Sequence, residues 1–192
     1  MGLARAHRVT YVGELGWEIY VPSDMAGHVF ETILDQNPTL AGLHVLDSCR
    51  IEKAFRHFGH DITDEDHVLE AGLGFAVDLS KDQFNGKQAV LDKKASGLSN
   101  RMIQLQLKDP EPLLYHNEPL VRDGQIVGFL TSGNYGHHLG GAIGMGYVPI
   151  EPGEKMSETL SSTFEVEVAG QRHEAIASFK PLYDPKSERV KA

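Results

Sequence analysis

The chain has 192 residues, 41% of them hydrophobic and 23% charged, which is typical of a soluble globular protein with one large or two small domains. The formal net charge is −9 and the Lys and Arg residues are scattered, which argues against nucleic acid as a main partner. No apolar run approaches the roughly 18 residues of a membrane-spanning helix, so no membrane partner is expected, and the single cysteine, Cys49, excludes an internal disulfide.

The N-terminal region has the pattern of a β-hairpin. Two β-prone runs, 8–12 and 17–21, flank a turn that contains Gly13 and Gly16. A two-stranded hairpin is only marginally stable by itself. The pattern therefore predicts either later strands that complete the sheet or a chain that is a piece of a longer protein.

Two helices are predicted after the hairpin. Ser23 or Asp24 can cap the first helix, which should end before Asn37. The second is predicted over about residues 47–58, with Gly59 as its C-terminal stop. Apolar residues at i, i+3, i+4 and i+7 form its buried stripe: Ile51, Ala54, Phe55 and Phe58.

The polar side of the second helix should face water, where Glu52 and Arg56 would form a modest i,i+4 ion pair. Alternating apolar residues over 73–77 predict a strand. A short helix is predicted from the Asn85-Gly86 turn to about residue 94.

Residues 93–100 have the composition of a linker, and we predict a boundary there between domains 1–97 and 98–192. Beyond it, Asp123-Gly124 predicts a tight hairpin turn. Strands are predicted over 102–107, 128–131, 143–148, 164–168 and 173–177, with Gly170-Gln171 turning the last pair. Short strands at this spacing predict a small antiparallel barrel or sandwich, so the expected class is α+β: an antiparallel sheet with helices, then a small β-barrel.

Ten histidines raise the question of a metal site. His57 and His60 lie three apart, with Asp61 and His67 near them, but Gly59 interrupts the helix that would align the first pair. No familiar zinc spacing occurs. Solvated or capping histidines are therefore favoured, and no metal is expected.

For the glycine-rich segment 140–146 and for Cys49, a structural role is favoured over ligand binding or catalysis. The glycine-rich segment 140–146 leads into a strand rather than a helix, which favours tight turns and close strand packing over a phosphate loop. Cys49 lies early in the second predicted helix, where the helix dipole could lower the thiol pKa, but a small structural cysteine is the favoured interpretation.

Tyr11 and Glu18 are the candidate ligand-binding residues. In the run 17–21, Glu18 shares one strand face with Tyr20. An acid at this place is either a solvent-facing residue or a pocket carboxylate that accepts two parallel N–H bonds from a planar, amidine-like edge, such as a pterin presents. Tyr11 could pack its ring beside such a ligand. The pattern alone leaves both alternatives open.

Five segments resemble, in the same order, motifs of the glycine-cleavage T-protein (aminomethyltransferase) superfamily. They are residues 11–19 (Tyr-Val-Gly-Glu-Leu-Gly-Trp-Glu-Ile), 46–53 (Leu-Asp-Ser-Cys-Arg-Ile-Glu-Lys), 58–62, 70–75 and 144–148. The Trp17 version of the first motif and the Arg50-Ile51-Glu52-Lys53 ending are most similar to the tetrahydrofolate-binding region of dimethylglycine and sarcosine dehydrogenases.

The resemblance implies a three-domain protein that passes a one-carbon unit from an aminomethyl or iminium donor to tetrahydrofolate. It implies that Glu18 holds the pterin edge, that Tyr11 lines the pocket and that Phe55 lies near the folate. It implies no catalytic residue in this chain, because the family's catalytic aspartate belongs to an N-terminal segment. Leu46 stands where T-proteins proper carry a folate-contacting arginine, which argues against glycine-cleavage activity itself.

We therefore expect the C-terminal, folate-binding half of a one-carbon transferase or of a dimethylglycine or sarcosine dehydrogenase, inactive when isolated. Its expected partners are folate, an amine-derived one-carbon donor and the missing N-terminal domain, and an upstream FAD domain fits the dehydrogenase case. The alternative is a non-catalytic folate-binding homologue that acts as a binding or assembly module. The expected compartment is the cytoplasm, or the mitochondrial matrix in a eukaryote.

Overall fold

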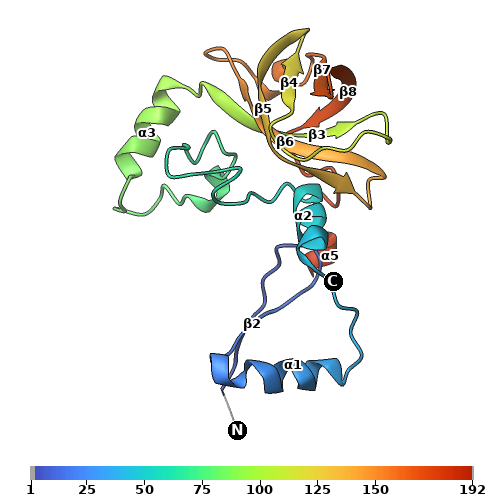
Figure 1. Cartoon of the computed structure of the whole chain (residues 1–192). Helices are drawn as coiled ribbons and strands as arrows, with labels where there is room; N and C mark the ends of the chain where they lie inside the picture. Colours follow the sequence, from blue (N-terminus) through green and yellow to red (C-terminus); the bar gives the residue numbers. More distant parts are fainter. Residues whose placement is uncertain (1–2, 192) are drawn as a thin grey trace.

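The computed structural model describes residues 3–191 and has a barrel at one end and a thin arm at the other (Figure 1). In chain order the elements are β1 (Arg5–His7), β2 (Glu18–Tyr20), the 3-10 turn η1 (Ser23–Met25), α1 (Ala26–Leu34), α2 (Leu43–Glu52), the 3-10 turn η2 (Gly74–Ala76), α3 (Lys87–Ser96), β3 (Asn100–Leu107), β4 (Pro119–Arg122), β5 (Gln125–Gly136), β6 (Gly141–Pro149), α4 (Met156–Thr159), β7 (Phe164–Val168), β8 (Gln171–Ser178) and α5 (Glu188–Lys191). None of these helices is long and apolar enough to cross a membrane.

Six strands close into an antiparallel barrel in the order β3-β6-β5-β4-β7-β8, and β8 pairs back with β3. The alternation of apolar residues puts one face of each strand inside. Eleven buried residues form this interior: Ile103, Leu105, Leu107, Leu114, Leu120, Leu130, Ala142, Val148, Phe164, Val166 and Ala175. The predicted α+β class and the predicted barrel are confirmed.

The sequence predicts two hairpin turns in the barrel, and the structure shifts the second of them by one residue. Asp123 (φ 49°) and Gly124 (φ 80°) form the predicted two-residue turn between β4 and β5. The last turn is Ala169-Gly170 rather than Gly170-Gln171, because Gln171 already pairs with the final residue of β7.

Two glycines of β6 lie where neighbouring backbone leaves no room for a side chain. A Cβ on Gly144 would lie 2.9 Å from the carbonyl oxygen of Ser132, and one on Gly146 would lie 2.7 Å from that of Phe129. The predicted role of these glycines in close strand packing is confirmed.

We expect Gly146→Ala to destabilise the protein by about 1–3 kcal/mol, because the added methyl forces β5 and β6 apart. Urea unfolding measures the change in the free energy of unfolding. Gly141→Ala in the same strand is the matched control, since its Cβ would meet its nearest neighbours at an ordinary 3.5 Å. Equal loss in both variants would contradict the packing argument.

Part of the outer face of β3 is also buried, where the C-terminal end of α2 meets it, while the length of α2 packs along β5. Met102 and Gln104 on this face are 4% and 2% exposed. The Gln104 amide donates to the carbonyls of Ile51 (2.5 Å) and Glu52 (3.1 Å), which satisfies carbonyls at the helix end, and accepts from the N–H of Leu182 (2.7 Å). One barrel strand therefore fixes both α2 and the C-terminal segment.

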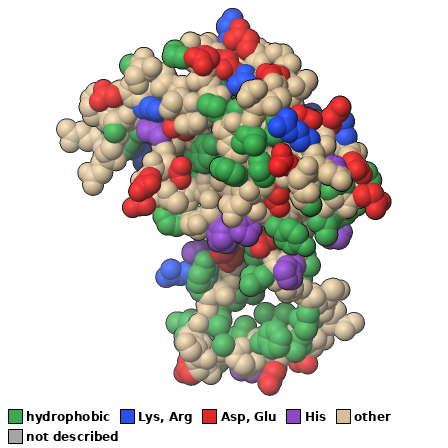
Figure 2. Space-filling view, turned by 45° about the horizontal axis from the view of Figure 1, so that its top comes forward, with side chains coloured by type: hydrophobic (Ala, Val, Ile, Leu, Met, Phe, Trp, Pro, Cys, Tyr) green, Lys and Arg blue, Asp and Glu red, His purple; other side chains and the backbone are tan. Residues whose placement is uncertain are grey.

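The arm, formed by β1, β2 and α1, has no fully buried side chain. Within residues 3–191 its sheet keeps only two strands. Exposed apolar side chains along the arm and its loop include Val9, Leu15, Trp17, Ile19, Phe30, Ile33 and Leu34. Figure 2 shows the apolar side chains that gather on this narrow part.

The predicted first strand of the hairpin, 8–12, is wrong. Arg5 pairs with Tyr20, and residues 8–17 form the connecting loop. Thr10 Oγ1 accepts the N–H groups of the two residues at 12–13, which turns the chain, and the loop is drawn into the body of the protein by contacts described below. The predicted caps of α1 are also wrong: its N-cap is Met25, without a side-chain bond.

The second helix ends earlier than predicted, at Glu52 instead of about residue 58. Ala54 takes the left-handed conformation (φ 52°), and the N–H of Phe55 donates to the carbonyl of Arg50 at 2.9 Å. This is the hydrogen-bond pattern of a Schellman helix end, with alanine in the usual place of glycine. Phe58 is consequently 69% exposed.

Of the two elements predicted after the second helix, the strand is wrong and the helix is confirmed. Residues 73–77 are not a strand, since η2 forms a single 3-10 turn there. The helix after Asn85-Gly86 is confirmed as α3, which also takes up the first part of the predicted linker, to Ser96.

Candidate functional site

Four consecutive residues at the end of α2 are buried, and three of them carry charge. Arg50, Ile51, Glu52 and Lys53 are 4%, 1%, 0% and 1% exposed. The prediction that Glu52 pairs with Arg56 in water is therefore wrong. Because buried charges are stable only with partners, each of the three must bind another part of the chain.

Arg50 binds the barrel and the loop after α2. Its guanidinium donates to Asp61 (2.8 Å) and to the hydroxyl of Ser132 on β5 (2.9 Å). Asp61 also accepts from the hydroxyl of Thr131 (2.5 Å) and from the N–H of His57 (2.9 Å). This buried ion pair joins α2, its following loop and β5.

Glu52 binds the turn between β5 and β6. It accepts the N–H groups of His138 (2.7 Å) and Leu139 (3.1 Å), and His138 Nδ1 lies 2.6 Å from its second oxygen. The imidazole of His138 stacks on the ring of Tyr183, with 4.2 Å between centroids. The carboxylate thus holds the turn and indirectly the C-terminal segment.

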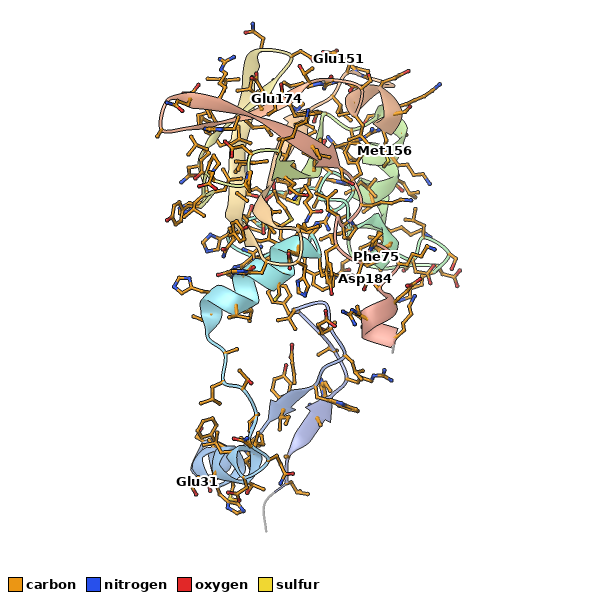
Figure 3. All side chains as sticks on the ribbon, turned by 90° about the vertical axis from the view of Figure 1, so that its right-hand side faces the viewer. Glu31, Phe75, Glu151, Met156, Glu174 and Asp184 are labelled. Atoms are coloured by element: carbon orange, nitrogen blue, oxygen red, sulfur yellow. The ribbon has the colours of Figure 1, made fainter. Side chains whose placement is uncertain are left out.

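Lys53 binds that C-terminal segment directly. Its ammonium donates to the carbonyl (2.6 Å) and carboxylate (3.2 Å) of Asp184, which is labelled in Figure 3, and to Ser187 (3.3 Å). Burial raises the pKa of Asp184, but the N–H of Glu188 and the Lys53 ammonium outweigh it and hold this pKa below its usual value.

The loop over residues 8–17 rests on the stem of Lys53. A Cβ on Gly13, whose φ is +80°, would lie 2.2 Å from Lys53 Cγ, so only glycine fits there. The hydroxyl of Tyr183 donates to Glu14 (2.7 Å) from the other side. These contacts fix the loop that carries Tyr11.

Tyr11 and Phe55 lie together, in a pocket of about 470 Å³. Their rings are nearly parallel, 6.2 Å apart at 11°, and the Tyr11 hydroxyl donates to the carbonyl of Arg56 at 2.8 Å. Burial raises the pKa of Tyr11. Aromatic and aliphatic side chains dominate the walls: Tyr11, Phe55, Ile62, Leu73, Phe75 and Phe179. Arg56 and Lys180 add positive charge, whereas the ammonium of Lys53 is paired with Asp184.

Glu18 lies outside this pocket. It is exposed on β2 and accepts a hydrogen bond from the hydroxyl of Tyr20 at 2.5 Å, and it is not among the residues that line the pocket. The structure therefore brings together two of the three predicted site residues.

Sequence reasoning missed several residues of the pocket wall. Phe179 and Lys180 come from the chain after β8, and no local pattern connects them with Tyr11. The burial of Lys53 could have been suspected, because Lys53 belongs to the motif 46–53 that resembles the T-protein family and lies two residues after the predicted buried Ile51.

The other candidate chemistries gain no support. Residues 3–191 contain no group of three or more His, Cys, Asp or Glu side chains that could hold a metal ion. Burial, with the charges of Glu52 and Glu14, raises the pKa of the Cys49 thiol, which is the opposite of what a nucleophile needs.

Two family models match this chain: the GCVT N-terminal domain over residues 2–81 and the glycine cleavage T-protein C-terminal barrel domain over residues 100–184. The chain belongs to the glycine-cleavage T-protein family. The resemblance found from the sequence motifs is thereby confirmed.

Relatives within the T-protein family are enzymes by name. The 4-methylaminobutanoate oxidase (formaldehyde-forming) of Paenarthrobacter nicotinovorans is 42% identical over 99% of this chain and 23% of that protein. Mitochondrial sarcosine dehydrogenase of Homo sapiens is 33% identical over 98% of this chain and 21% of its own length. The aminomethyltransferase of Halothermothrix orenii is 38% identical over 78% of this chain and 44% of its own length.

A solved T-protein structure has the same fold. Glycine cleavage system aminomethyltransferase T from Bartonella henselae superimposes with a TM-score of 0.78 and 28% identity, over 93% of this chain and 50% of that one. The chain thus spans half of this structure and less than half of the three curated relatives.

We expect Asp61→Asn to destabilise the protein by about 3 kcal/mol, the lower end of the cost of leaving a buried charge without its partner, because Asp47 still accepts from Arg50. Urea unfolding measures this change. Glu174→Gln is the control, since Glu174 pairs with Lys108 at the exposed surface (Figure 3) and its loss should leave stability unchanged. An unchanged Asp61→Asn variant would show that the ion pair does not hold the parts together.

Proposed function

We propose that this chain is the tetrahydrofolate-binding portion of a T-protein-like one-carbon transferase, or of a dimethylglycine or sarcosine dehydrogenase. The observation that carries the proposal is the parallel pair Tyr11 and Phe55 in one aromatic pocket. Aromatic rings favour a flat heterocyclic ligand, which packs against their faces. The positive charges of Arg56 and Lys180 suit the carboxylates at the other end of a folate.

In this proposal Glu18 holds the pterin edge. An ionised carboxylate accepts two parallel N–H bonds from such an edge, and this pairing is both strong and orienting. Because Glu18 lies on the exposed arm, the complete site needs a covering wall over β1 and β2. The exposed apolar side chains of the arm, Trp17 among them at 60%, support that need.

The proposed partner for the arm is the preceding half of the T-protein fold. The solved T-protein is about twice as long as the part this chain matches, which supports the assignment. The proposal assigns residues 1–97 to the folate-binding domain and 98–192 to the barrel domain. This chain would bind and orient folate, while the proton-transferring aspartate would come from the preceding half.

A nitrogen of tetrahydrofolate would attack the carbon of an amine-derived iminium donor. The donor's carbon–nitrogen bond would then break with release of the amine, and a second folate nitrogen would close the methylene bridge with loss of its proton. In the dehydrogenase version, an upstream FAD domain of the parent protein would first oxidise the amine. In the alternative, a non-catalytic homologue, folate binding would remain and transfer would be absent. Assay of the parent protein for methylene-tetrahydrofolate separates these cases.

We expect Glu18→Gln in the full-length parent to weaken folate binding by about 1–3 kcal/mol, the cost of losing a charge-assisted hydrogen bond. Isothermal titration calorimetry with tetrahydrofolate measures the affinity. Glu31→Gln is the matched control, because Glu31 lies on α1 at the far end of the arm from the barrel (Figure 3). Equal affinities for wild type and Glu18→Gln would remove Glu18 from the site.

Tyr11→Ala tests the pocket independently. It removes one of the two stacked rings, so we expect weaker folate binding in the same titration, whether or not Glu18 contributes. If Tyr11→Ala binds folate as tightly as wild type, the pocket is not the folate site.

We expect the isolated 192-residue chain to fold but not to transfer one-carbon units, because loss of a proton-transferring group costs about two to four orders of magnitude in rate. Folate affinity should also be weak, since water screens the exposed Glu18. The exposed apolar arm should cause concentration-dependent self-association, measurable by analytical ultracentrifugation. Methylene-tetrahydrofolate formation by the purified chain would show that the active site lies within it.

A further inference from the structure

A second pocket, of about 210 Å³, lies along the face of α2 that carries His44, Asp47 and Ile51. It shares no lining residue with the aromatic pocket. Its opposite wall is β5, at residues 131–134. The proposed folate function uses none of these side chains.

Four of the ten histidines line this second pocket, and they come from three separate segments: His44 on α2, His57 and His60 in the following loop, and His116 before β4. The rings of His57 and His60 are 4.6 Å apart. Figure 2 shows histidine side chains gathered where the barrel meets the arm. Because no metal-binding group occurs within residues 3–191, these histidines offer N–H donors rather than a chelating set.

One of the lining side chains is a buried cation, the guanidinium of Arg50. Arg50 has five N–H groups. Its hydrogen bonds to Asp47, Asp61, the carbonyl of Phe55 and Ser132 use four of them. The fifth N–H, on the nitrogen that donates to Ser132, is thus left for a ligand, and Arg50 is among the lining residues.

Two polar side chains of β5 add donors. Ser132 accepts from Arg50 with its hydroxyl oxygen, so its own hydrogen is available. Asn134 accepts the N–H of Tyr135 with its amide oxygen (2.7 Å), so its NH2 group is available. The groups that face the pocket are thus mainly donors.

The charge of the pocket depends on the histidines. Asp47 is the one acid among the lining residues, and its carboxylate is held by Arg50 at 2.8 Å. Asp61 pairs with Arg50 at 2.8 Å and is not among the lining residues. With neutral imidazoles the two carboxylates exceed the single guanidinium by one charge, and each imidazole that takes up a proton adds one positive charge.

We propose that this pocket binds a small oxyanion, either an inorganic anion or the carboxylate of a small organic acid. Arg50, Ser132 and Asn134 would donate hydrogen bonds, and protonated histidines would supply the charge. The volume suits a tetrahedral oxyanion with a few waters, since one water occupies about 30 Å³ of liquid. Binding strengthens as the pH falls from 8 to 6.

The test is calorimetric titration of the full chain with sodium sulfate at pH 6.0 and pH 8.0, at constant ionic strength. Sulfate keeps its charge over this range, so any change in affinity comes from the protein. We expect about tenfold tighter binding at pH 6.0, the size of a charge-assisted contact. A parallel titration with acetate distinguishes a carboxylate site from one that prefers inorganic anions.

Two His→Gln variants, one at the pocket and one outside it, test where the anion binds. His116→Gln, on an exposed loop at the pocket, should reduce the affinity at pH 6.0 several-fold. His173→Gln should leave it unchanged, because His173 lies on β8 opposite Asp109. The proposal is overturned if neither anion binds at pH 6.0, or if the two variants bind sulfate with equal affinity.

Discussion

The burial of Arg50, Glu52 and Lys53 makes three other parts of the chain converge on the end of α2. A buried charge without a partner costs several kcal/mol, so each of these residues requires a group of opposite charge or a set of hydrogen bonds. The partners come from the loop after α2, from the β5–β6 turn and from the C-terminal segment. The rest of the structure depends on this junction.

The junction explains how the aromatic pocket is built. Lys53 supports the loop over residues 8–17 through Gly13, and Tyr183 holds the same loop through Glu14. The left-handed turn at Ala54 ends α2 and turns the next residue toward that loop. The pocket therefore lies where structural contacts already hold its walls, and ligand binding need not order them.

The arm contrasts with the junction. It has no buried side chain, while the barrel has a closed sheet and a continuous apolar interior. Regions with few buried contacts open at low free-energy cost, so the arm is the less stable part of the chain. Glu18 lies on the arm and Tyr11 beside the junction, so a ligand that used both would join the exposed arm to the part of the chain that the buried charges hold.

The sequence by itself determined the family, the barrel and the helix α3. Alternating side chains, the Asp123-Gly124 turn and the Asn85-Gly86 turn act locally, so patterns of a few residues report them. The sequence motifs also singled out Tyr11, Glu18 and Phe55, and two of the three share a pocket. These features needed no knowledge of contacts distant in sequence.

Only the tertiary structure decided where α2 ends, where the hairpin begins and that Glu52 is buried instead of facing water. A helical pattern through Phe58 was locally acceptable, but the barrel amide of Gln104 and the partners of the buried charges end the helix six residues earlier than expected. The separation of Glu18 from Tyr11 likewise depends on contacts to residues more than forty positions away. Local pattern cannot report such contacts, because the free energy of burying a charge depends on groups that the neighbouring sequence does not contain.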